Sequence, residues 1–256
     1  MSLCLIGSIT YFYQNENSKV YKILKAFSIV ENTRKLFHIG NSEEKQLRSL
    51  NGFRVLSMFM VMMGHSYSTS IAAPIQNMTT FTKILNAPLF SIIGTATFAV
   101  DTFFFLSGFL TFYLLTSKIY PLHGKINVLG LYLHWYLRLF PLLFFGVLFG
   151  SFIYPHIDNG TNFDWVKNII VDNCSWYWWS NFLFINNIVP WSENDECMAW
   201  VWYLANDMQF FIISPFLISL YFKNWKAGYI LICSLIVITC IIPFTLSMIY
   251  KIPAVI

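Results

Sequence analysis

Hydrophobic residues gather in long blocks along this chain, and polar residues fall between the blocks. At about 1.5 Å of helix rise per residue, five blocks are long enough to cross a hydrocarbon core of about 30 Å. These blocks are Gly52–Ser70, Ile93–Leu115, Leu129–Tyr154, Trp200–Phe222 and Ala227–Ile249. A shorter block, Met1–Tyr13, predicts a partial span. Because barrel-type alternation is absent, we expect an all-α fold, a polytopic transmembrane helix bundle.

The polar stretches predict how the chain is organised around these spans. We expect residues 1–13 to form the partial transmembrane segment and residues 14–49 a cytosolic linker. Residues 50–256 should form one membrane domain that is incomplete at its C-terminal end, with a lumenal loop at 155–199.

Composition and charge define the environment. The chain is 57% hydrophobic and 11% charged, whereas an average globular chain is about 25% charged. This excludes a soluble, a disordered or a nucleic-acid-binding protein and makes the lipid bilayer the first partner. Basic residues concentrate in 14–49, near Lys118 and near Lys223, so the positive-inside rule places these segments in the cytosol. The acidic segments between them should be lumenal or extracellular.

Three N-x-S/T patterns lie in segments that are predicted to be outside. They stand at Asn77, Asn159 and Asn173, and they predict a glycoprotein of a eukaryotic secretory pathway, at the endoplasmic reticulum or the plasma membrane. The pattern is short, so a chance match is the alternative at each site.

Two cysteines bracket an aromatic-rich outer segment. Cys174 and Cys197 share an oxidising compartment at a separation that allows loop closure, which predicts a disulfide bond between them. Two free thiols, or pairing with a part of the protein outside this sequence, are the alternatives. The tryptophans of the segment predict anchoring at the level of the lipid headgroups.

Ionisable residues inside the spans carry the functional argument, because each costs about 2.5–3.5 kcal/mol at the bilayer centre on insertion scales. Arg54 and His65 are eleven residues apart, within about 20° of one helix face and roughly 16 Å apart along it. His65 is a candidate general base, or a histidine hydrogen-bonded between helices. Arg54 is a candidate anion ligand, or a side chain that reaches the lipid phosphates.

Three further ionisable residues lie in later spans. Asp101 shares a helix face with Gly108, Arg138 precedes Pro141, which we expect to disrupt the helix, and Asp207 lies in the fourth block. Paired charges that hold the bundle together and catalytic groups are both consistent with these positions. We expect all five ionisable side chains to line one interior cavity, and we predict no metal site.

Four motifs follow one another between residues 50 and 215. They are an arginine and a histidine with ten residues between them at Arg54 and His65, D-x-F-F-x-L-S-G-F-L at Asp101 to Leu110, R-x-x-P at Arg138 to Pro141, and W-x-L-x-x-E at Trp202 to Asp207. The last motif has aspartate in place of glutamate. The series resembles the membrane acyltransferase 3 family, and specifically its animal nose-resistant-to-fluoxetine branch. Members of the family have more spans, so the resemblance implies a fragment.

The resemblance implies acyl transfer across the bilayer. Cytosolic acyl-CoA would be the co-substrate, with no bound cofactor, and the acceptor would be a hydroxyl or amine of a lipid, a glycan or a small molecule on the outer side. The implied catalytic residues are His65, as general base, with Asp101 or Asp207 orienting it. The implied substrate-binding residues are Arg54, Ser107 and Arg138. A transport or uptake factor for lipids or small molecules on the same scaffold is the alternative.

Overall fold

The structure is a computed structural model of the chain. It describes residues 2–12, 19–38, 45–72, 83–84, 87–119, 127–157, 160 and 163–251. These residues divide into two compact units, unit 1 from Met1 to Asn51 and unit 2 from Gly52 to Ile256.

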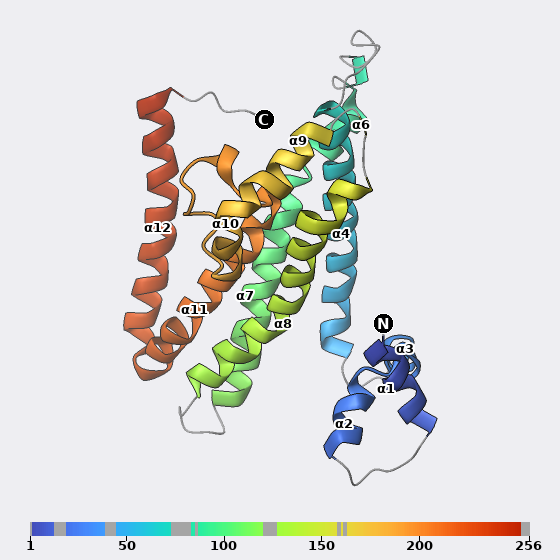
Figure 1. Cartoon of the computed structure of the whole chain (residues 1–256). Coiled ribbons are helices and arrows are strands. Elements are labelled where there is room, and N and C mark those ends of the chain that lie inside the picture. The colour runs from blue at the N-terminus through green and yellow to red at the C-terminus, as the bar shows by residue number, and fades with distance from the viewer. Residues whose placement is uncertain are drawn as a thin grey trace. The chain divides into compact units, whose positions relative to one another are not determined.

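Every regular element among these residues is a helix, which confirms the predicted all-α fold (Figure 1). Unit 1 contains α1 (Ser2–Phe12), α2 (Lys19–Ala26), α3 (Ile29–Leu36) and the start of α4 (Lys45–Ala72). Unit 2 continues with α6 (Pro88–Gly94), α7 (Thr97–Ile119), α8 (Val128–Leu148), α9 (Phe163–Lys167), α10 (Asn173–Phe182), α11 (Trp202–Lys223) and α12 (Trp225–Tyr250). Short π and 3-10 turns follow α8 and α9 and precede α11, at Phe149–Ile153, Tyr154–His156, Asn168–Asp172, Glu193–Asp195 and Ala199–Val201.

Four of the predicted spans are helices long and apolar enough to cross a membrane. Within the described ranges these are Thr97–Ser117, Val128–His156, Ala199–Lys223 and Trp225–Tyr250. The predicted span Gly52–Ser70 lies in α4, which has 28 residues but is not among the four. Its arginine, its histidine and its serine-rich end lower its hydropathy.

Helix α11 is the centre of unit 2. It packs against α7 and against α12, and α8 reaches it through Tyr132, whose hydroxyl donates a 2.6 Å hydrogen bond to the carbonyl oxygen of Ile212. The chain reverses direction between α7 and α8 and again between α11 and α12, and Figure 1 shows both reversals at the lower end of this unit. The expected break at Pro141 is wrong, because α8 continues through this residue to Leu148.

The predicted outer loop is folded rather than open. Its residues form α9 and α10, and Cys174, Phe184 and Met198 lie in a core with Leu143 and Val147 of α8. Cys174 and Cys197 are joined with their Cα atoms 4.4 Å apart, which confirms the predicted disulfide. Four tryptophans of this segment remain exposed, Trp176, Trp178, Trp179 and Trp191.

Asn173 begins α10 beside the disulfide. Its Nδ2 donates hydrogen bonds to the carbonyl oxygens of Asn194, at 2.6 Å, and Glu196, at 3.2 Å. Its side chain therefore connects the start of α10 to the segment that carries Cys197. The other two predicted glycosylation sites, Asn77 and Asn159, lie outside the described residues.

The contact between α11 and α12 generates a first prediction. A Cβ atom at Gly228 would lie 2.6 Å from the Cα of Tyr221, whereas a Cβ at Gly146 would meet nothing within 4 Å. Gly228→Leu should therefore push the two helices apart and cost about 1–3 kcal/mol of stability. Thermal unfolding of the purified chain in detergent measures this, with Gly146→Leu as the matched control. Equal midpoints for the two variants would contradict the contact.

The disulfide generates a second prediction. Alkylation of the unreduced protein followed by peptide mapping should modify Cys4, Cys233 and Cys240, which are free in the structure, and leave Cys174 and Cys197 linked. Alkylated Cys174 in folded, unreduced protein would refute the link.

Candidate functional site

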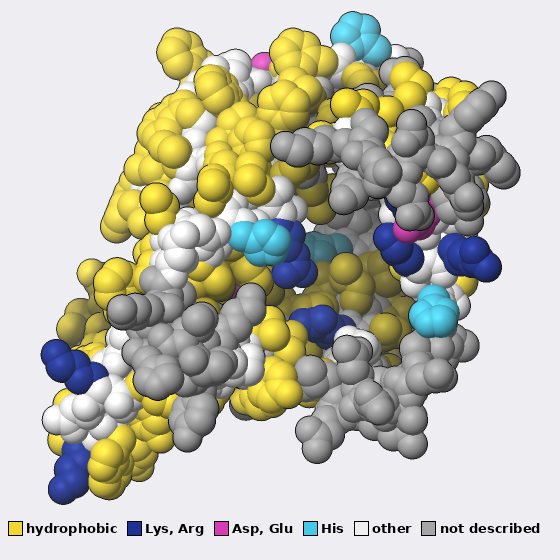
Figure 2. All heavy atoms as spheres, turned by 90° about the horizontal axis from the view of Figure 1, so that it is seen from below, with side chains coloured by type: hydrophobic (Ala, Val, Ile, Leu, Met, Phe, Trp, Pro, Cys, Tyr) yellow, Lys and Arg dark blue, Asp and Glu magenta, His cyan; other side chains and the backbone are white. Residues whose placement is uncertain are grey.

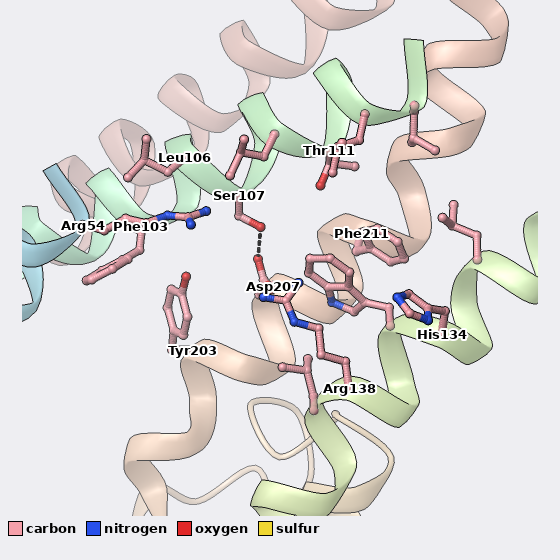
Figure 3. A pocket seen from close by; sticks show the side chains of 16 residues that line it. Arg54, Phe103, Leu106, Ser107, Thr111, His134, Arg138, Tyr203, Asp207 and Phe211 are labelled. Atoms are coloured by element: carbon pink, nitrogen blue, oxygen red, sulfur yellow. Dashed lines mark hydrogen bonds between the residues drawn. The ribbon is translucent and has the colours of Figure 1, made fainter. Parts of the chain in front are cut away.

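A cavity of about 380 Å³ opens inside unit 2 between α7, α8 and α11 (Figure 3). One arginine of α4 reaches it as well. The polar residues that line it are Arg54, Ser107, Thr111, His134, Arg138, Tyr203 and Asp207, and the remaining wall is leucine, phenylalanine and tryptophan. It is a largely apolar chamber with a few polar groups, as is usual for a small-molecule site.

Helical spacing explains why these side chains meet. Tyr203, Asp207 and Phe211 follow one another at intervals of four on α11, and His134 and Arg138 have the same interval on α8. Residues four apart lie on one face of a helix, so each helix presents a single stripe to the cavity.

A hydrogen bond joins two walls of the cavity. The hydroxyl of Ser107 on α7 donates to Oδ1 of Asp207 on α11 over 2.6 Å (Figure 3). The carboxylate on α11 lies within a span, and α7 supplies its hydrogen-bond donor. Polar groups that bond across helices hold such bundles together.

Arg138 is held by an aromatic stack. Its guanidinium lies 5.0 Å from the ring centroid of Trp135, which in turn stacks on Phe211 at 4.3 Å. In Figure 3 the guanidinium extends toward Asp207, while that of Arg54 enters the cavity from the side of Ser107. Cation–π contact fixes the position of Arg138 and leaves its N–H donors for other partners.

Neither arginine of the cavity forms a close ion pair with the carboxylate. Among the residues that the structure describes, ion pairs within 4.0 Å involve Glu31 of unit 1, and neither Arg54 nor Arg138 is within that distance of a carboxylate. The interpretation that these charges only pair to hold the bundle together is therefore not supported. Two arginines against Asp207 leave the cavity with an excess positive charge, which favours an anionic ligand.

His65 lines a second cavity, of about 390 Å³, between α4, α6 and α7. Tyr67, Ser68, Thr97 and Trp202 belong to its wall. Here α4 closely approaches the turn between α6 and α7, since a Cβ on Gly64 would lie 2.7 Å from that of Ala96. His65 does not line the first cavity.

The expectation that five ionisable side chains share one cavity is thus wrong for two of them. Arg54, Arg138 and Asp207 meet, together with Ser107, but His65 and the exposed Asp101 lie elsewhere. Asp101 is six residues before Ser107, which turns it about 240° around α7 and away from the stripe that lines the cavity. The catalytic roles of His65, Asp101 and Asp207 remain predictions.

Three polar residues of the cavity were missed by the sequence argument: Thr111, His134 and Tyr203. Each is four residues from a residue that was singled out, namely Ser107, Arg138 or Asp207. The interval of four is the signal that would have found them.

Comparison with known proteins agrees with this architecture. The acyltransferase domain model of the acyltransferase 3 family matches residues 47–256. The chain is 32% identical to nose resistant to fluoxetine protein 6 of Caenorhabditis elegans over 254 residues, which cover 93% of this chain and 30% of that protein. The chain therefore spans about a third of the length of this relative. No solved structure matches the chain significantly.

The bond between α7 and α11 generates a third prediction. Ser107→Ala removes the hydrogen-bond donor of a partly buried carboxylate and should cost about 1–3 kcal/mol, measured as a lower thermal midpoint in detergent. The matched control is Ser117→Ala on the same helix, because in the described part of the chain the hydroxyl of Ser117 donates to the carbonyl oxygen of Leu114 in its own turn and not to another helix. An unchanged midpoint for Ser107→Ala would mean that the bond does not stabilise the bundle.

Proposed function

The chain belongs to the acyltransferase 3 family, and from this premise we propose that it moves an acyl group from cytosolic acyl-CoA to a hydroxyl or amine acceptor on the other side of the membrane. The acceptor would be a lipid, a glycan or a small molecule. The proposal concerns the whole protein, of which the described residues supply the membrane-embedded site.

The observation that carries the proposal is an apolar cavity lined by two arginines that, among the described residues, have no carboxylate within 4.0 Å. Acyl-CoA combines the same two chemistries, since its phosphates are anionic and its acyl chain is apolar. Arg54 and Arg138 would bind the phosphates, and Ser107 would add a hydroxyl. The flexible arm of CoA would extend along the apolar wall and the shared face of α4, so that the thioester meets the acceptor at His65.

One face of α4 links the two cavities. Arg54 lines the first and His65 the second, about 20° apart around the helix and roughly 16 Å apart along it. We assign the acceptor to the cavity of His65. There the imidazole takes the proton of the acceptor hydroxyl or amine, the acceptor attacks the thioester carbonyl, the bond between carbonyl carbon and sulfur breaks, and the CoA thiolate leaves and is protonated.

The carboxylates fit this scheme in different ways. Asp207 holds Ser107 and faces Arg138, which supports a positioning role in the donor cavity. An orienting role toward His65, for Asp101 or Asp207, has no support from the lining of the His65 cavity.

The helix directions support the proposed sidedness. The C-terminal end of α7, which carries Lys118, and that of α11, which carries Lys223, lie at the same end of unit 2 (Figure 1). We place this end in the cytosol by the positive-inside rule and the disulfide-linked segment in the lumen or outside. Residence in the endoplasmic reticulum or the plasma membrane follows from the same proposal.

A transport or uptake factor on this scaffold is the second candidate function. It is favoured by the lining of the His65 cavity, which contains no carboxylate among the described residues, because a general base commonly has a carboxylate to orient it. Two mostly apolar cavities along one helix face could pass a lipid or a small apolar compound without turnover.

Assays on the full-length protein with radiolabelled acyl-CoA provide the fourth prediction. His65→Ala should lower kcat about 10²–10⁴-fold, as expected for loss of a general base. Arg138→Gln should raise KM for acyl-CoA about 10-fold or more, because a hydrogen bond to a charged group contributes about 1.5–3 kcal/mol. Lys226→Gln, which removes a cation from the α11–α12 turn, is the control and should change neither constant.

The same variants separate the two functions. An enzyme loses labelled product in His65→Ala. If no labelled lipid, glycan or small molecule forms with the wild type, and uptake of a labelled lipid persists in His65→Ala, the acyltransferase proposal is refuted and the transport function is supported.

A further inference from the structure

The cavity of His65 is mostly apolar. No aspartate, glutamate, lysine or arginine is among the described residues that line it. Valine, isoleucine and aromatic rings form most of the wall, and the ring of Tyr67 packs edge-on against that of Phe90, with their centroids 5.7 Å apart. The site therefore offers an entering molecule a hydrocarbon surface with a small number of polar atoms.

The sequence extends this observation to the elements around the cavity. Between Glu44 and Asp101 the chain has no acidic residue, and this stretch supplies α4, α6 and the connection that joins them. Asp101 is one turn beyond Thr97 on α7, but it is exposed and does not line the cavity. Helices α4 and α6 therefore cannot supply a counterion for a bound cation.

The polar groups of the wall are suited to one hydroxyl better than to many. The hydroxyl of Ser68 donates to the carbonyl oxygen of His65 at 3.0 Å, within its own turn of α4. Other polar groups are spread over three helices, with Tyr67 on α4, Thr97 on α7 and Trp202 on α11. A sugar would turn several of its hydroxyls toward the apolar wall, and each buried hydroxyl without a partner weakens binding.

Basic groups lie at a different level of unit 2. Figure 2 views the molecule from below Figure 1, toward the end of the unit at which α7 and α11 finish, and shows basic side chains in dark blue on that face. Arg54 lies on the same face of α4 as His65, but roughly 16 Å before it along the helix. The charged donor and an uncharged acceptor thus have separate places along one helix.

We propose that the acceptor is an uncharged alcohol with an apolar body, and that the cavity of His65 excludes amines and glycans. This rests on the acyl transfer proposed above and names its acceptor. The imidazole takes the hydroxyl proton, the oxygen attacks the thioester carbonyl carbon, and the bond between this carbon and sulfur breaks. The products are an ester and CoA, whose thiolate receives the proton.

The charge of the acceptor decides between an alcohol and an amine. An aliphatic amine has a pKa of about 10.4, so at neutral pH nearly all of it is the ammonium form. A buried ammonium binds poorly without a carboxylate beside it. An alcohol enters uncharged, and the imidazole of His65 is the one acceptor that its proton needs.

Competition between three ligands with the same alkyl chain tests the proposal and is the fifth prediction. The full-length protein in nanodiscs is photolabelled with a diazirine derivative of decanol, and labelled peptides that cover residues 61–68 and 90–100 are quantified. Decanol should suppress this labelling at a concentration about 10²-fold lower than decylamine or decyl glucoside does. Diacylglycerol added to the bilayer distinguishes a membrane lipid, which would compete, from a small apolar alcohol as the source of the hydroxyl.

Two variants at one position of the wall show that charge sets the preference. Val100→Asp places a carboxylate in the cavity and should lower the concentration at which decylamine competes by about tenfold or more. Val100→Asn is the matched control, because it has the same size and polarity without the charge, and it should leave the exclusion of decylamine in place.

The outcomes separate this proposal from the one on which it rests. Competition by decylamine or decyl glucoside at the same concentration as decanol, in the wild type, would overturn the choice of an apolar alcohol. Photolabelling needs no turnover. If decanol binds with the expected preference but radiolabelled acyl-CoA yields no decyl ester, the proposed acyl transfer is refuted and the ligand preference of the cavity stands.

Discussion

The hydrogen bond between Ser107 and Asp207 is the interaction on which the polar interior of unit 2 depends. Between helices in lipid there is little hydrophobic driving force, so packing and polar contacts decide which helices stay together. Asp207 lies on α11, the helix that contacts both α7 and α12, and its carboxylate bonds directly to α7. The cavity lies beside this contact, and it keeps its shape only as long as α7 and α11 keep their distance. The stability of the bundle and the geometry of the site thus rest on the same pair of side chains.

Length and hydropathy were enough to predict the helices, because a chain in lipid has to satisfy its backbone hydrogen bonds within each span. The compartment argument also identified the partner of Cys174.

The site was predicted only in part. Arg54, Arg138 and Asp207 were placed together correctly, but the positions of the His65 and Asp101 side chains depend on how each helix is rotated about its axis. That rotation is set by close contacts such as Gly64 against Ala96, which a single sequence does not reveal. The folding of 155–199 into helices was missed for a related reason, since its core is formed by residues from α8 and α11.

The beginning of α11 stands between the two cavities. Trp202 lines the cavity of His65, and the next residue, Tyr203, lines that of Arg138. Phe104 contacts both rings, with centroid distances of 6.3 Å to Trp202 and 4.7 Å to Tyr203. An aromatic group therefore stands where the walls of the two cavities adjoin.

The hydrogen bonds of Asn173 bear on how the protein matures. In both bonds the donor is Nδ2, the atom to which a glycan would be attached. Both acceptors lie in the segment that the disulfide joins to α10. A glycan would replace one of the two hydrogens on Nδ2, so a glycosylated Asn173 could keep at most one of the two bonds. Glycosylation there would loosen the tie between the start of α10 and the segment that carries Cys197, and the disulfide would be left to hold the two together.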